Sequence, residues 1–298
     1  MSNTVPYLGE SLALLTALVW ALAVILFKKS GEKMHPLALN LFKNILAFML
    51  LVPTIFIAGE NLFHDAPAGD YIFLLISGFL GIGIGDTLFF KSLNLVGAGL
   101  SSIIACMYSP FIIILSVVFL GESLALLQIV GIAMILSAVL TATGSNGTRP
   151  LTRRDLWLGI LYGALANAST AVGVVLIKPI LTRSPLLWAT EARLFSGMMT
   201  VALVLWLHPA RKKIAQPIMN GRQWLYTFSG SLAGAYLSMI IWLAGMKLTQ
   251  ASIAAALNQT SNIYVFIFAA LFLQEKVNVR RVIGILLGVG GTLLVTFG

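Results

Sequence analysis

Long apolar stretches, separated by short polar connections, repeat along the whole chain. Each stretch is close to the roughly 20 residues that a helix needs to cross the hydrocarbon core of a bilayer. The pattern therefore predicts ten transmembrane helices. They are expected at 7–27, 36–58, 71–92, 97–119, 124–143, 156–177, 186–207, 223–246, 251–273 and 279–297.

The connections between these stretches leave no room for a soluble domain. Only three of them are long, at 59–70, 144–155 and 208–222, and these are rich in turn-forming or basic residues. Any function must therefore lie within the membrane part. The first stretch begins near Tyr7 without a basic segment before it, so we expect it to be a retained helix, not a cleaved signal peptide.

The composition agrees with an all-α integral membrane protein. Hydrophobic residues make up 59% of the chain and charged residues only 10%, whereas soluble domains carry roughly 25% charged residues. The mean hydropathy is +0.96. A chain this apolar must be solvated largely by lipid, and we expect a multi-pass protein of the plasma or inner membrane.

The net charge of +9 is spread over the connections and forms no continuous basic stripe, which argues against nucleic acid as a partner. Fourteen Lys and Arg residues lie in odd-numbered connections and three in even-numbered ones. The positive-inside rule then places the odd connections in the cytoplasm and both termini outside. The fourteen are Lys28, Lys29, Lys33, Lys91, Arg149, Arg153, Arg154, Arg211, Lys212, Lys213, Arg222, Lys276, Arg280 and Arg281.

No cofactor or metal is expected. The single cysteine, Cys106, lies inside an apolar stretch, and no His/Cys cluster has the spacing of a zinc site. His35, His64 and His208 each lie near the end of a stretch, as interfacial or loop histidines do. No nucleotide-binding signature occurs, so transport would be driven by an ion or solute gradient.

The two halves of the chain resemble each other. At a constant offset of 153 residues, Gly81 meets Gly234, Glu122 meets Glu275 and Gly131 meets Gly284. Near an offset of 150, Lys43 meets Arg193 and Lys28 meets Lys178. Five helices per repeat place the second half upside down relative to the first, which is typical of secondary transporters. We therefore predict two inverted five-helix repeats, at 1–148 and 149–298.

Four ionisable residues within the predicted helices stand out as candidates: Lys43, Asp86, Glu191 and Arg193. Each needs a partner or water because an unpaired charge in lipid is costly. Lys43 and Asp86 are expected at similar depth and could pair, either as a gate or proton-sensitive site or as a structural ion pair. Glu191 and Arg193 are two residues apart and do not face each other, so each needs another partner.

Polar residues on several helices are candidates for binding a solute. Ser102, Cys106 and Ser109 follow the i, i+4, i+7 spacing of one helix face. Two of their repeat equivalents are Gln259 and Asn262. The alternative for all of them is hydrogen bonding between helices. The full set is Trp20, Ser102, Cys106, Ser109, Asn167, Asn258, Gln259 and Asn262.

These residues carry a resemblance to the EamA-type branch of the drug/metabolite transporter superfamily. It rests on Trp20, Lys43, Pro110 and the motifs FLGES (119–123) and FLQEK (272–276), with Gly131 and Gly284 following them. The resemblance implies a basket of ten helices around a central cavity, with the fifth and tenth helices at the periphery, and alternating access. Family members often have Arg where Lys43 stands, and many place both termini in the cytoplasm.

The sequence therefore predicts a secondary transporter, a permease or exporter that moves a small metabolite or drug-like solute. Protons are a candidate coupling ion, and the protein is expected to be a monomer or homodimer. The alternatives are a membrane-embedded enzyme acting on a lipid substrate and a structural or regulatory subunit. The enzyme is disfavoured because Asp86 and Glu191, the two acids deep within the predicted helices, lie in different halves.

The charge distribution generates a test of orientation. Epitope tags fused to either terminus should be labelled by membrane-impermeant reagents in intact cells, because both ends are expected outside. Labelling of the tags only after permeabilisation would reverse the predicted orientation.

Overall fold

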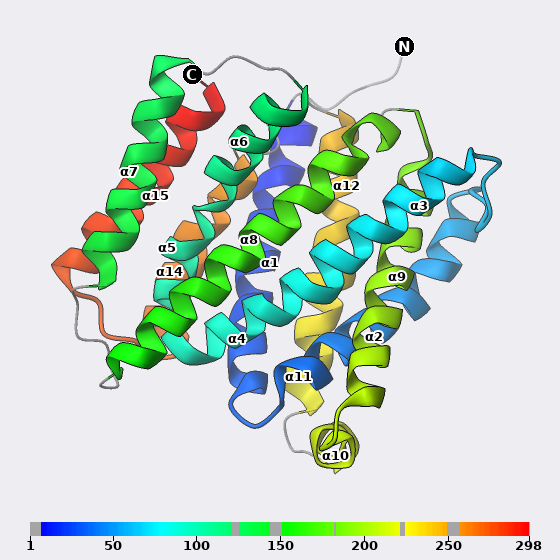
Figure 1. Ribbon diagram of the computed structural model, residues 1–298, viewed down its shortest axis with the longest axis horizontal. Helices are drawn as coiled ribbons and strands as arrows, with labels where there is room; N and C mark the ends of the chain where they lie inside the picture. The colour runs from blue at the N-terminus through cyan, green and yellow to red at the C-terminus, as the bar shows by residue number, and fades with distance from the viewer. Residues whose placement is uncertain are drawn as a thin grey trace.

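The computed structural model describes residues 7–120, 125–143, 151–181, 183–220, 224–248 and 257–297. These residues form a bundle of helices joined by short turns, without a strand in the described ranges (Figure 1). An all-helical chain satisfies its backbone hydrogen bonds within each segment, as the hydrocarbon region requires.

The first half of the chain contains eight helical elements. They are α1 (Leu8–Gly31), α2 (Pro36–Ile57), α3 (Ala68–Ser77), the π-helix η1 (Gly78–Gly85), α4 (Asp86–Val96), α5 (Ala98–Ala105), α6 (Tyr108–Leu120) and α7 (Leu126–Thr143).

The second half contains eight helical elements in the described ranges. Its elements are α8 (Arg153–Leu181), α9 (Leu186–Leu207), α10 (Arg211–Asn220), α11 (Trp224–Ser231), the π-helix η2 (Leu232–Leu237), α12 (Ser238–Leu248), α14 (Ser261–Phe272) and α15 (Val279–Phe297).

Several of these helices have the length and apolar composition of membrane spans. Among the described residues five are long enough to cross a bilayer: Leu8–Gly31, Pro36–Ile57, Ala68–Val96, Arg153–Ile177 and Leu186–Leu207. Shorter apolar helices cover Ala98–Ile112, Leu126–Ala142 and Leu257–Phe272.

The outer surface of the bundle is apolar, which fits contact with lipid. Met49 on α2, Leu140 on α7 and Leu286 on α15 are each about two-thirds exposed. A soluble protein rarely leaves so much large apolar surface in water. The structure therefore supports a multi-pass membrane protein.

The stretch 97–119 was expected to be one helix, and this expectation is wrong. The chain turns at Cys106 and Met107, between α5 and α6. Pro110 has no N–H to donate to the carbonyl of Cys106, and the amide of Ser109 donates to that carbonyl instead, at 3.3 Å. The break interrupts the helix face that Ser102, Cys106 and Ser109 were expected to share.

The stretch 71–92 is helical throughout but contains the π-helix η1, whose sequence is GFLGIGIG. Glycines of the neighbouring helices α8 and α9 let these helices approach this segment closely. A methyl group placed on Gly173 of α8 would lie 3.0 Å from the carbonyl oxygen of Ser77, and one on Gly197 of α9 would lie 2.5 Å from Ile82 Cβ. Close helix approach, not phosphate binding, explains this glycine-rich segment.

Helices α7 and α15 pack together at one edge of the bundle (Figure 1). A methyl group on Gly131 would lie 2.6 Å from the carbonyl oxygen of Gly291, and one on Gly291 would lie 2.7 Å from that of Gly131. Gly284 lies against the carbonyl of Ala138 in the same way. The two helices therefore meet backbone to backbone.

The connection 208–222 contains the helix α10, which the sequence pattern did not predict. The segment reads RKKIAQPIMN and is too polar and too short for a span. Ile214 alone anchors it among the described residues by inserting into the core formed with α1 and α2. Figure 1 places α10 at the end of the bundle opposite to the start of α1 and the end of α15.

The contact between α7 and α15 generates a stability test. Gly291→Ala should lower the unfolding free energy by about 1–3 kcal/mol, because the added methyl group meets the carbonyl of Gly131. Gly290→Ala is the matched control, since its methyl group meets only the flexible end of Met134 at 3.4 Å. The measurement is the thermal midpoint of purified protein in detergent. Equal midpoints for the two variants would contradict the packing.

Candidate functional site

An ion pair lies in the interior of the bundle. Lys43 Nζ on α2 is 2.7 Å from Asp86 Oδ2 at the start of α4, and this confirms the predicted pairing of the two residues. The Lys43 side chain is 8% exposed and that of Asp86 is 29% exposed. Lys43 is therefore enclosed, whereas the carboxylate still faces accessible space.

Two asparagines of α2 flank this pair, and sequence reasoning missed both of them. Asn40 donates to the carbonyl oxygen of Ile82 at 2.9 Å and to Thr87 Oγ1 at 3.0 Å. Asn44 donates to Asn40 Oδ1 at 3.0 Å, while its own Oδ1 is buried without a partner in the described part of the chain. Asn40 thus binds a carbonyl of the π-helix η1 and fixes α2 beside Asp86. The signal in the sequence was the spacing of polar residues within PLALNLFKNILAF.

Arg193 of α9 lies on the other side of η1. Its backbone carbonyl contacts Gly78, and its Nη2 atom would lie 3.6 Å from a methyl group on Gly81. Gly78 is closer to the start of α3 than Gly81 is. The Arg193 side chain therefore extends away from the start of α3 and into the bundle. Asp86 and Tyr108 are close enough to act electrostatically on the guanidinium. Arg193 thus joins the Lys43–Asp86 pair in one charged cluster.

Glu191 does not join this cluster. It is partly exposed and makes no ion pair with any residue that the structure describes. Its carboxyl group is affected mainly by burial and not by a neighbouring charge. This agrees with the expectation that Glu191 and Arg193 do not face each other. Of the four predicted ionisable residues, the structure therefore brings together Lys43, Asp86 and Arg193.

A second group of predicted residues meets where α5 packs on α14. Asn262 Nδ2 lies 3.5 Å from Cys106 Sγ and 3.0 Å from Gln259 Oε1. Cys106 also contacts Gly288 of α15, and Ser102 donates to the carbonyl of Gly99. These contacts are hydrogen bonds within and between helices, which was the structural alternative for these residues.

The other predicted solute residues are dispersed. Asn167 of α8 donates to the carbonyl oxygens of Gly163 at 2.7 Å and Ile104 at 3.3 Å, so it joins α8 to α5. Trp20 packs against Phe89 at a ring distance of 6.4 Å, as a packing aromatic does. Ser109 is buried on α6. Asn258 has a buried Oδ1 with no partner among the described residues, and a turn at Thr260 separates it from Asn262.

The motif FLQEK has a structural role. The two carboxylate oxygens of Glu275 accept hydrogen bonds from the amides of Ala98 at 2.8 Å and Gly99 at 3.1 Å. Glu275 therefore caps the N-terminus of α5, where a negative charge is favourable. Arg281 approaches the same carboxylate at 3.7 Å. Its counterpart in FLGES, Glu122, lies outside the described residues.

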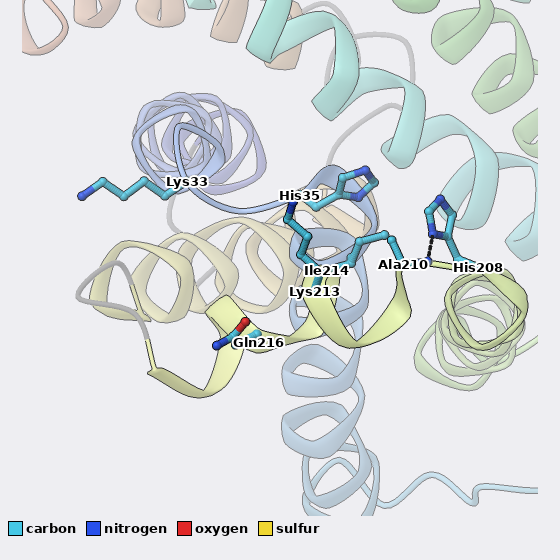
Figure 2. Close-up of a pocket in the computed structure, with 7 residues that line it drawn as sticks. All are labelled: Lys33, His35, His208, Ala210, Lys213, Ile214 and Gln216. Carbon is cyan, nitrogen blue, oxygen red and sulfur yellow. Dashed lines mark hydrogen bonds between the residues drawn. The ribbon is translucent and has the colours of Figure 1, made fainter.

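A surface pocket of about 550 Å³ lies at the end of the bundle that carries α10 (Figure 2). His35 and His208 face each other there with ring centroids 6.3 Å apart, while Lys33 points away from both imidazoles (Figure 2). The Nδ1 atom of His35 accepts from the amide of Leu37, and that of His208 accepts from Ala210. None of the predicted solute residues lines this pocket, so it is separate from the charged cluster.

His35 and His208 lie at helix ends, as the sequence predicted. Burial lowers the pKa of His35, and electrostatic repulsion from His208 and Lys91 lowers it further. His35 therefore stays neutral near pH 7, and its Nδ1 atom can accept the hydrogen bond that begins α2.

Similarity to known proteins supports the same class of protein. A curated relative from Archaeoglobus fulgidus, described as an uncharacterized transporter, is 23% identical over 276 residues, which is 92% of each chain. A chain in a solved crystal structure is 17% identical and matches with a TM-score of 0.66 over 96% of both chains. At this level of identity the crystal structure supports the fold alone.

The family comparison covers nearly the whole sequence. The model of the EamA-like transporter family matches residues 7–144 and matches again at residues 157–297. Together with the apolar helical bundle, this match confirms the resemblance that the motifs indicated. The chain belongs to the EamA-like transporter family and is a multi-pass membrane transporter.

Proposed function

We propose that the chain is a secondary transporter that exposes the Lys43–Asp86–Arg193 cluster to one side of the membrane and then to the other. In this proposal ten spanning helices form two inverted repeats, at 1–148 and 149–298, and the solute binds between them. An ion or solute gradient drives the exchange, and the solute is a small metabolite or drug-like molecule that is moved across the plasma or inner membrane.

Local irregularities at equivalent positions support the repeat. The family model matches each half separately. Shifting η1 by 153 residues gives 231–238, which contains η2. The break after α5 has a counterpart before α14, because Met107 N donates to Ile104 O at 3.0 Å and Thr260 N donates to Leu257 O at 3.1 Å. Each residue of the second bond lies 153 positions after its counterpart in the first.

The packing partners also fit an exchange of the two halves. Helix α1 packs on α12 and α14, while α8 packs on α4 and α6. Helix α2 packs on α9, α5 on α14 and α7 on α15. If each half is exchanged for the other, the contacts of α1 with α12 and α14 become those of α8 with α4 and α6, while the contacts of α2 with α9 and of α7 with α15 map onto themselves. Such a pattern is expected of inverted repeats.

The charged cluster is the single observation that carries the proposed mechanism. Lys43 and Arg193 occupy equivalent positions on α2 and α9, and Asp86 lies within electrostatic range of both. Met239 stands where the second half would have the counterpart of Asp86. One carboxylate thus lies within electrostatic range of two equivalent cations, and a change of partner or a proton on Asp86 could accompany each change of access. Protons are therefore the proposed coupling ion.

Of the two paired groups, the Asp86 carboxylate is accessible to a new partner, whereas the Lys43 ammonium is enclosed. The carboxylate is 29% exposed, so water and protons can reach it, while the ammonium is 8% exposed. Because the Lys43 ammonium is enclosed, breaking the pair without a replacement partner for Lys43 would cost several kcal/mol. A solute or a proton that supplies a replacement would lower that cost.

The test is transport in proteoliposomes. Purified protein is reconstituted with a mixed panel of amino acids, sugar phosphates, nucleotides and organic cations, and exchange across the membrane is followed by mass spectrometry. Asp86→Asn and Lys43→Ala should each lower the exchange rate by about ten-fold or more, because each removes half of a buried pair. For both variants, the fractional loss of transport should exceed the fractional loss of protein yield in the membrane.

Asp155→Asn serves as the matched control, because Asp155 lies at the exposed start of α8 and bonds only to Thr152 in the described region. Its exchange rate should stay within about two-fold of wild type, as a solvated surface charge contributes little. Near-normal exchange by both Asp86→Asn and Lys43→Ala would remove the pair from the mechanism. Absence of exchange by the wild-type protein for every solute class would contradict the proposed function itself.

A further inference from the structure

The charged cluster carries an excess of positive charge. Lys43 and Asp86 form an ion pair and neutralise each other. Arg193 is left over, since it is too far from Asp86 for a direct ion pair and makes no ion pair elsewhere in the described chain. A guanidinium remains charged at any physiological pH. An uncompensated charge in a membrane interior costs several kcal/mol, which argues that a further anion completes the site.

The atoms of Arg193 are arranged to bind such an anion. Its Nε atom is buried and has no hydrogen-bond partner in the described ranges. The guanidinium lies beside Gly81, whose lack of a side chain lets it approach the backbone of η1 closely. A guanidinium with one enclosed edge and free donors presents the planar fork that binds carboxylates and phosphates through two parallel hydrogen bonds.

The neighbouring groups do not supply that anion. Asp86 is already bound by Lys43 at 2.7 Å, and Glu191 makes no ion pair with Arg193. Tyr108 is the other group near the guanidinium, and a phenol is neutral at pH 7. The site around Asp86 therefore contains two positive charges and only one negative charge.

We propose that the transported solute is a small organic anion whose carboxylate or phosphate group binds Arg193. This inference rests on the proposed function, because it assigns the solute to the same site between the two halves. The pair of Lys43 and Asp86 lies next to the bound group, so a solute that also carries an amino group can contact the exposed carboxylate. A simple organic cation would instead be repelled by the net charge of the cluster.

The proposal is tested by ligand binding to the purified full-length protein in detergent. The probes are two carboxylates (glutarate and benzoate), two phosphates (glycerol 3-phosphate and phosphoenolpyruvate), two cations (putrescine and tetraphenylphosphonium) and glucose. At least one anion should raise the thermal midpoint of the wild-type protein, and neither cation should do so. Comparison of the carboxylates with the phosphates identifies the acidic group that the site prefers.

Variants at Arg193 give the specific result. Arg193→Gln should weaken the binding of that anion by about ten-fold or more, because it removes a charge-assisted bidentate contact. Arg193→Lys should have an intermediate effect, since it keeps the charge but loses the planar fork. Arg211→Gln is the control, because Arg211 lies on the exposed helix α10 and donates to the carbonyl of Trp206. Its anion affinity should equal that of wild type.

Several results would overturn the proposal. Stabilisation by the cations alone would do so, as would the same response of wild type and Arg193→Gln to every anion in the panel. If Arg193→Gln does not give a single peak in size-exclusion chromatography, the comparison of Arg193→Lys with Arg211→Lys replaces it. Transport of cations or glucose by the wild-type protein, unaffected by Arg193→Gln, would contradict the anionic solute while leaving the transporter function intact.

Discussion

The absence of water from the hydrocarbon region is the constraint on which the rest of this structure depends. Every backbone group and charge within the bundle must find its partner inside the protein. The Lys43–Asp86 pair meets this requirement at 2.7 Å, and Asn40 meets it for a carbonyl of the π-helix η1. Arg193 departs from it, because its Nε atom is buried without a partner among the described residues. The departure marks the place where we propose that the solute binds.

The same constraint explains how the helices are interrupted. A break in a helix frees backbone groups, and in this structure each break lies against another part of the protein. The carbonyl of Ile82 within η1 is bound by Asn40, and the amides of Ala98 and Gly99 at the start of α5 are bound by Glu275. Glycines then allow neighbouring helices to approach these irregular segments closely. At these two sites the irregular backbone therefore lies against other parts of the protein, where a transport site and its moving parts would lie.

Much of the architecture could be predicted from the sequence because hydropathy reports directly on lipid contact. The apolar stretches located the helices, and the motifs identified the family. The pairing of Lys43 with Asp86 was predicted from their depth alone. The break at Cys106 was missed, since it depends on Pro110 and on packing against α14, and α10 was missed because a short polar helix has no hydropathy signal. Cys106 and Asn262 were singled out as solute ligands, yet they bond to each other across two helices.

An experimentally determined structure of the protein in a lipid nanodisc tests the central claim most directly. The account predicts that residues 7–144 superpose on residues 157–297 after a rotation near 180° about an axis in the membrane plane. That rotation should exchange Lys43 with Arg193 on either side of Asp86. Two halves that superpose only by a rotation about the membrane normal, or a Lys43 that faces lipid far from Asp86, would contradict the account.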